Sequence, residues 1–225
     1  MLTGGVDETP RVLARHADIV ALEKPAGWLV HPVGTEALDL VGWARAQGLG
    51  RLRPAHRLDL DTSGVVLFGK TVEATARLGG WFTEGAVAKR YLALVYDVPP
   101  ASGVIDVPLA DSRRARPLAA VTEFSVECAL GRFALLALTP RTGRKHQLRR
   151  HLSGIGHPIV GDREYPVKPF RKVPGFPGRL WLHAASLRLP DGFVVESPLP
   201  AVLAAHVDLL SAQRRPPDAP LDARA

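Results

Sequence analysis

The chain of 225 residues has one cysteine, one methionine, few aromatic residues and no long apolar run. Its single cysteine, Cys128, excludes an intramolecular disulfide and any zinc site built from several cysteines. We expect Cys128 to be a passive, buried thiol. Because no run of about 18 apolar residues occurs, no membrane-spanning helix is predicted. The first residues carry no secretory signal pattern, so a reducing cytoplasm is the expected location.

Acidic residues are fewer than basic ones: the chain has 22 Asp and Glu and 29 Lys and Arg, which gives a net charge of +7. This balance favours a polyanionic partner, with nucleic acid ahead of a membrane surface. The hydrophobic share of 46% excludes a largely disordered chain. The 21 glycines and 20 prolines predict many loops.

Short apolar runs separated by turn residues predict an α+β fold with a mixed, largely antiparallel central sheet and flanking helices. Strands are expected at 18–23, 64–69, 88–96, 121–130, 133–138 and 179–189, and helices at 37–47, 72–84, 143–154 and 200–213. We expect a single domain over residues 11–213. A loose leader at 1–10 and a disordered tail at 214–225 are expected to flank it.

The segment 53–64 places two carboxylates, Asp59 and Asp61, after two arginines and a histidine and before a predicted buried strand. A carboxylate that a nearby arginine keeps ionised can act as a nucleophile or a base. Two other interpretations stay open. Asp61 and Thr62 can cap the backbone of a solvated turn, or Asp59 and Asp61 can share a hard metal ion.

Two further segments combine charge with possible chemistry. Lys89 and Tyr91 share one face of a predicted strand, where a tyrosine either packs in the core or stacks on a planar base. Segment 141–151 has five cations, two histidines and no acid. This density favours phosphate contacts over a merely solvated basic face, because like charges one helical turn apart repel. Arg149 and Arg150 point in different directions on a helix, so one can face a site while the other meets solvent.

Taken together, these segments resemble the RluA-type family of RNA pseudouridine synthases. Blocks in family order carry the similarity: EKPAG at 23–27, VHP at 30–32, HRLD at 56–59, TSGV at 62–65, KRYLALV at 89–95, TGRKHQLR at 142–149, HPIVGD at 157–162 and LHA at 182–184. The resemblance implies a catalytic domain that isomerises a uridine of structured ribosomal or transfer RNA to pseudouridine. It also implies no metal, no organic cofactor, no membrane and no obligatory protein partner.

Carried over position by position, the resemblance assigns roles to individual residues. Asp59 matches the catalytic aspartate, Tyr91 the tyrosine that packs against the target base, and Arg149 the basic partner of the aspartate. Arg57 matches the arginine that fills the space left by the extruded nucleotide. The other predicted RNA contacts are His56, Arg144, Lys145, His146 and Gln147.

Two other functions stay open at this stage. Charge alone is compatible with a non-catalytic basic RNA-binding protein. Asp59 and Asp61 are compatible with a metal-dependent phosphoryl-transfer enzyme. For the isomerase itself, attack of the carboxylate on the ribose and removal of a sugar proton toward a glycal are both possible routes. The loop at 168–179 is equally compatible with a role in RNA contact and with a surface loop that has no such role.

Overall fold

The computed structural model describes residues 8–32 and 38–213. The strands are β1 Arg11–His16, β2 Ile19–Lys24, β3 Arg53–Pro54, β4 Ser63–Gly69, β5 Ala88–Tyr96, β6 Ser102–Asp106, β7 Val121–Leu130, β8 Phe133–Pro140, β9 Leu182–Arg188 and β10 Val194–Glu196. The helices are α1 Leu40–Ala46, α2 Val72–Thr83, α3 Gln147–Gly154 and α4 Ala201–Ala212.

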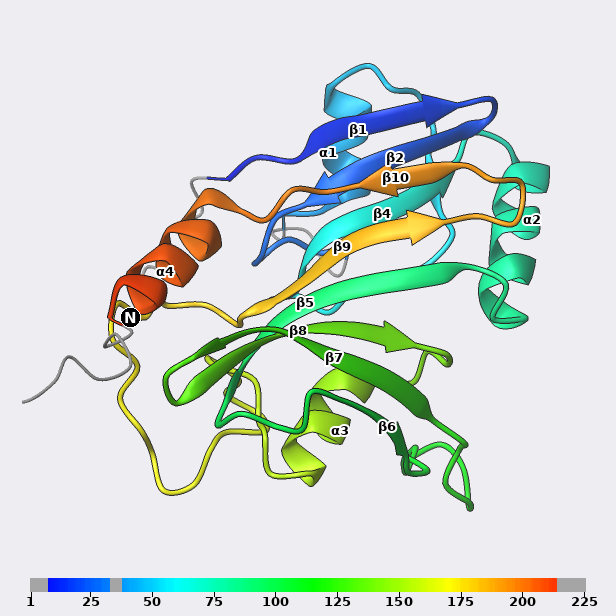
Figure 1. Cartoon of the computed structure of the whole chain (residues 1–225). Coiled ribbons are helices and arrows are strands. Elements are labelled where there is room, and N and C mark those ends of the chain that lie inside the picture. The colour runs from blue at the N-terminus through cyan, green and yellow to red at the C-terminus, as the bar shows by residue number, and fades with distance from the viewer. Residues whose placement is uncertain (1–7, 33–37, 214–225) are drawn as a thin grey trace, which may run out of the picture.

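The described strands form one sheet in the order β1-β2-β4-β9-β5-β8-β7-β6, with β10 paired to β9 and β3 paired to β4 (Figure 1). Strands β4 and β9 pair in parallel, and the other strand pairs are antiparallel. The predicted α+β fold with a mixed, largely antiparallel sheet is therefore confirmed. Among the described residues, no helix has the length and apolar character needed to cross a bilayer.

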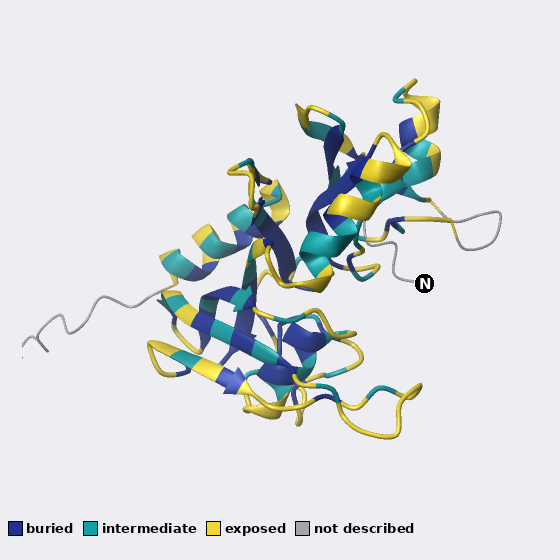
Figure 2. Cartoon of the chain, turned by 90° about the vertical axis from the view of Figure 1, so that its right-hand side faces the viewer, coloured by how far each residue is buried: buried dark blue, intermediate teal, exposed yellow. Residues whose placement is uncertain are grey.

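The sheet is buried on both faces where it passes between the helices, as the dark strands of Figure 2 show. Successive residues of β4 alternate between two cores: Val66 and Phe68 pack with α1, whereas Val65 and Leu67 pack with α2. A third core joins β5, β7 and β8 to α3 and α4. The side chain of Tyr91 contacts this third core and the α1 core, so it lies where two halves of the molecule meet.

Gly64 allows the first residues of β4 to lie directly against β9. Its φ is +123°, and a Cβ atom there would lie 2.2 Å from the carbonyl oxygen of Ala184. Only glycine accepts both this backbone conformation and this close approach. The contact fixes the start of β4, and the turn before it carries Asp59.

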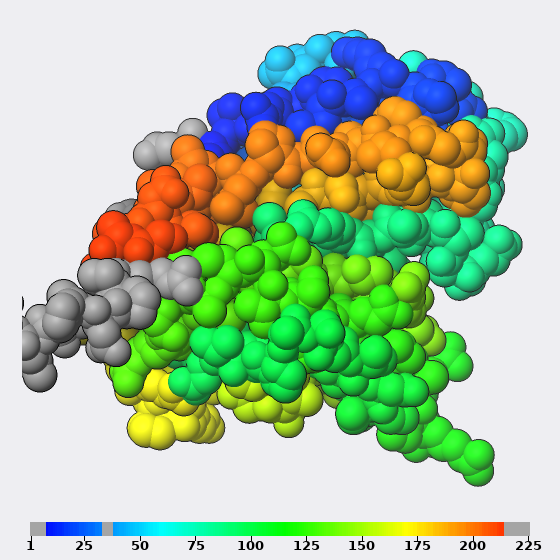
Figure 3. Space-filling view, viewed as in Figure 1, coloured from blue at the N-terminus to red at the C-terminus, as the bar shows by residue number. Residues whose placement is uncertain are grey.

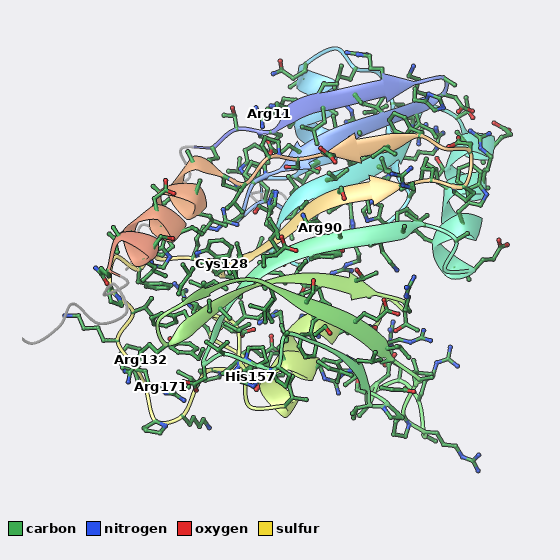
Figure 4. The ribbon with its side chains drawn as sticks, viewed as in Figure 1. Arg11, Arg90, Cys128, Arg132, His157 and Arg171 are labelled. Atoms are coloured by element: carbon green, nitrogen blue, oxygen red, sulfur yellow. The ribbon has the colours of Figure 1, made fainter. Side chains whose placement is uncertain are left out.

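Two sequence-based expectations need correction. Cys128 is half-buried rather than buried (Figure 4), because the register shift between Val126 and Cys128 interrupts the alternation of β7. The basic helix begins at Gln147, later than predicted, because His146 before it adopts a left-handed conformation. The predicted disordered tail at 214–225 lies outside the described residues, as do residues 1–7 of the leader.

Candidate active site

The turn between β3 and β4 presents the carboxylate of Asp59. Its backbone carbonyl accepts a hydrogen bond of 3.1 Å from the N–H of Thr62, which closes the turn. The Oδ2 atom of Asp59 lies 3.6 Å from Nη1 of Arg149, and Oδ1 lies 3.8 Å from Nε2 of His146. The two carboxylate oxygens thus face two different basic side chains.

Lys24, at the end of β2, anchors this turn from inside the protein. Its fully buried Nζ donates hydrogen bonds to the carbonyl oxygens of Pro25, Trp28 and Leu60, at 3.0, 2.8 and 2.8 Å. Burial lowers the pKa of Lys24 to about 7. The sequence analysis includes this lysine in the EKPAG block at 23–27 but assigns it no role. The available signal was a lysine at the end of a buried strand, where an ammonium group requires acceptors.

Arg149 is held mainly by Asp162 rather than by Asp59. Its Nε and Nη2 donate to the two oxygens of Asp162 at 2.7 and 2.8 Å, and Nη2 lies 3.4 Å from Glu164. Burial opposes ionisation of Asp162, but bonds from Arg149 and two backbone N–H groups hold the pKa of this carboxyl below its usual value. This two-point attachment fixes the guanidinium plane, so Nη1 is left facing Asp59.

Tyr91 lies on β5 just after a register shift against β9. Burial, together with the negative charge of Asp59, raises the pKa of Tyr91 far above its usual value. The phenol is therefore neutral at physiological pH.

The three residues assigned to catalysis by resemblance line one groove. Asp59, Tyr91 and Arg149 bound a cavity of about 1290 Å³, and a second cavity of about 350 Å³ shares Asp59 and Arg149 with it. The cations along the larger groove are Arg57, Lys89, Arg113, Arg114, Arg144, Lys145 and Arg150. Two of them lie on the loop between β6 and β7, which extends from the body of the molecule (Figure 3). Four of the five cations of segment 141–151 thus line this groove, whereas Arg141 pairs with Glu123.

Two predicted RNA contacts, His56 and Gln147, have their side chains bonded within the protein, although Gln147 also borders the larger groove. The ring of His56 stacks on Phe82 with centroids 4.2 Å apart, and its Nε2 accepts the N–H of Leu67 at 3.0 Å. Burial lowers the pKa of His56 to about 3, so it is uncharged. Its surroundings are those of a residue that supports β4.

Gln147 is also buried, with its side-chain amide fully bonded within the protein. Its Oε1 accepts from the hydroxyl of Thr142 and the N–H of Arg144, and its Nε2 donates to Val121 and Thr122. These bonds shape the loop before α3, which explains the late start of the helix. Gln147 has no bonding capacity left for RNA in this arrangement.

Asp59 and Asp61 both border the smaller cavity. Within residues 8–32 and 38–213, no group of three or more histidine, cysteine or acidic side chains is placed to hold a metal ion. The geometry therefore gives no support to a metal site shared by these two aspartates.

Comparison with known proteins places this chain among enzymes that modify RNA. A family model described as RNA pseudouridylate synthase matches residues 18–154. The tRNA pseudouridine synthase C of Salmonella typhimurium is 37% identical over 217 residues, covering 84% of this chain and 82% of that protein. The dual-specificity RNA pseudouridine synthase RluA of Escherichia coli is 36% identical over 190 residues, covering 79% and 85%. The structure of human RNA Pseudouridylate Synthase Domain Containing 4 superimposes with a TM-score of 0.77 at 28% identity, covering 89% of this chain and 92% of that one.

The chain belongs to the RNA pseudouridylate synthase family. Its class of activity is the isomerisation of uridine to pseudouridine in RNA. The resemblance inferred from the sequence motifs is confirmed. The alternative of a non-catalytic basic RNA-binding protein is not supported by these relatives.

Proposed function

We propose that this chain isomerises a uridine in structured transfer or ribosomal RNA, and that Asp59, Tyr91 and Arg149 carry the reaction. The observation that carries this proposal is their common groove, in which Asp59 lies 3.6 Å from a guanidinium nitrogen of Arg149. The names of relatives, tRNA pseudouridine synthase C and dual-specificity RNA pseudouridine synthase, support this class of substrate.

The target uridine must leave its stack to reach Asp59, because its glycosidic bond is inaccessible inside a helix or stacked loop. Extrusion costs a few kcal/mol. Arg57 has an exposed side chain that borders both cavities, which supports a role in filling the vacated space. Cations along the groove, Arg144 and Lys145 among them, offset the rest of the cost by binding phosphates.

The reaction breaks the bond between uracil N1 and ribose C1′, turns the base, and forms a bond between C5 and C1′. The proton on C5 is lost and N1 gains one, so the product is an isomer of the substrate. Asp59 serves as the nucleophile at C1′, or as the base that removes a sugar proton on the route through a glycal. Both routes use the carboxylate in its ionised form, and Oδ2 of Asp59 lies 3.6 Å from Nη1 of Arg149.

Tyr91 provides an aromatic face for the uracil while it is detached from the sugar. Base–aromatic stacking is worth about 1–3 kcal/mol. Because its pKa is raised, the phenol stays protonated and does not add a second negative charge beside Asp59. The ring can therefore hold the base without repelling electron density on it.

Release of tritium from RNA labelled at uracil C5 tests this assignment. Asp59→Asn keeps the size of the side chain but removes its charge, so we expect label release to fall by about 1000-fold or more while RNA is still bound. Asp61→Asn, two residues away, is the matched control and should keep its rate within a few-fold. Release from Asp59→Asn near the wild-type rate would remove Asp59 from its role. Loss of release with a chelator would favour metal chemistry instead.

A further inference from the structure

His146 borders both cavities and lies between two carboxylates. Its Nε2 is 3.8 Å from Oδ1 of Asp59, and its Nδ1 is 3.2 Å from both Oε2 of Glu164 and the hydroxyl of Tyr165. The ring meets the Tyr165 ring edge-on, with centroids 5.9 Å apart. Only 13% of the His146 side chain is exposed, which is little for a residue whose main task is to bind phosphate.

The hydrogen bonds around Glu164 orient the imidazole. The hydroxyl of Tyr165 donates to Oε1 of Glu164 at 3.1 Å, so its free lone pairs and Oε2 of Glu164 both present acceptors to Nδ1. Nδ1 therefore faces Glu164 and Tyr165, which leaves Nε2 facing Asp59. An imidazole ring with a proton on both nitrogens is a hydrogen-bond donor at each of them.

The backbone of His146 is held in a conformation that is uncommon for residues other than glycine. Its φ and ψ are 52° and 29°, in the left-handed region. The next residue, Gln147, imposes this conformation, because its side chain ties the preceding loop to Thr142 and Arg144 and ties itself to β7. Strained residues of this kind persist where the surrounding structure enforces them, and they concentrate at functional sites.

We propose that His146 is a positioning residue for Asp59, holding one carboxylate oxygen while Arg149 holds the other. The proposal rests on the catalytic role proposed for Asp59. The titratable groups that face His146 are Asp59 on the β3–β4 turn and Glu164 and Tyr165 on the turn after α3, and Arg149 on α3 faces the same carboxylate of Asp59. Two separate basic contacts restrict rotation of the carboxylate, so that it is already aimed when the ribose arrives.

His146→Gly separates positioning from structural support. Glycine takes the left-handed conformation without strain, so the melting temperature should not fall. The single-turnover rate of label release should fall by about 10-fold to 100-fold, with the affinity for RNA changed less than about threefold. Free imidazole in the buffer, which fits the space left beside Asp59, should restore part of the rate. His16→Ala removes an exposed histidine that stacks on Phe193 and should change none of these quantities.

Other outcomes would overturn the proposal. An unchanged rate in His146→Gly would show that Arg149 alone is sufficient to position Asp59. Weaker RNA binding with an intact single-turnover rate would make His146 an RNA contact, as the sequence motif suggested. A fall in melting temperature that parallels the fall in rate would indicate a structural role. Absence of label release from the wild-type protein would instead overturn the proposed function itself, which distinguishes the two failures.

Discussion

At the scale of single residues, the buried pair Arg149–Asp162 sets both stability and geometry. Side-chain exposures of 10% and 1% mean that neither charge is well hydrated. Removing one partner of a buried pair costs about 3–5 kcal/mol, because the other charge stays buried and uncompensated. We expect Asp162→Asn to lower the free energy of unfolding at pH 7 by about that amount, and to slow label release because Nη1 of Arg149 loses its fixed position.

The pH dependence of this effect has a definite sign. The pKa of Asp162 is lower in the folded protein than in the unfolded chain, so its stabilising contribution is present above about pH 4 and is lost on acidification below that. Urea unfolding of wild type and Asp162→Asn should differ most at pH 7 and converge at acidic pH. Glu127→Gln, which breaks the exposed pair with Arg90, should cost less than about 1 kcal/mol. Arg90 is labelled in Figure 4. A difference that is the same at both pH values would contradict this account.

Residue types in short motifs predicted which chemistry is present, but not which way each side chain points. Asp59, Tyr91 and Arg149 line a common groove, as the motifs implied. His56 and Gln147 come from the same motifs and yet point inward. Their direction depends on β4 and β7, which are distant in the sequence. Asp162 was missed as the main partner of Arg149 because that pairing exists only after folding.

At the scale of the strand, the parallel contact between β4 and β9 makes Gly64 irreplaceable. An alanine there would have a strained φ and a Cβ atom 2.2 Å from a backbone oxygen of β9, which cannot move aside alone. We expect Gly64→Ala to destabilise the protein by about 3 kcal/mol, measured by urea unfolding. Gly79→Ala within α2 meets no atom within 4 Å and should stabilise by about 1 kcal/mol. Equal effects of the two substitutions would show that the close approach is not maintained in solution.

Elements with a strong apolar pattern could be predicted from the sequence, whereas the edge strands could not. The strand expected at 88–96 coincides with β5, and Thr71 caps α2 by accepting the N–H of Ala74. Strand β1 has no fully buried residue, so its sequence lacks the pattern that marks a core strand. The start of α3 was misplaced because local propensity does not include the long-range bonds of Gln147.

At the scale of the whole molecule, the groove lies where the two halves of the sheet meet. Lys24 and Asp59 belong to the half built around β2 and β4, whereas His146 and Arg149 belong to the half built around β7, β8 and α3. Tyr91 on β5 packs against both cores. The carboxylate and its basic partners therefore come together only when both halves are folded, which is why no single segment of the sequence contains the site.

RNA affinity should depend on the cations that line the groove rather than on the net charge of the molecule. The logarithm of the RNA association constant falls linearly with the logarithm of salt concentration, and each lost phosphate contact lowers that slope by about 1. Arg114 and Arg144 line the groove, so the double substitution to alanine should lower the slope by about 2. Arg15 and Arg132 are exposed and outside the groove lining, with Arg132 at the β7–β8 turn (Figure 4). Replacing Arg15 and Arg132 with alanine removes the same amount of charge as replacing Arg114 and Arg144. If the salt slope of this control stays near the wild-type value, RNA binds along the groove. If the slope falls equally in the two double variants, binding depends on net charge alone.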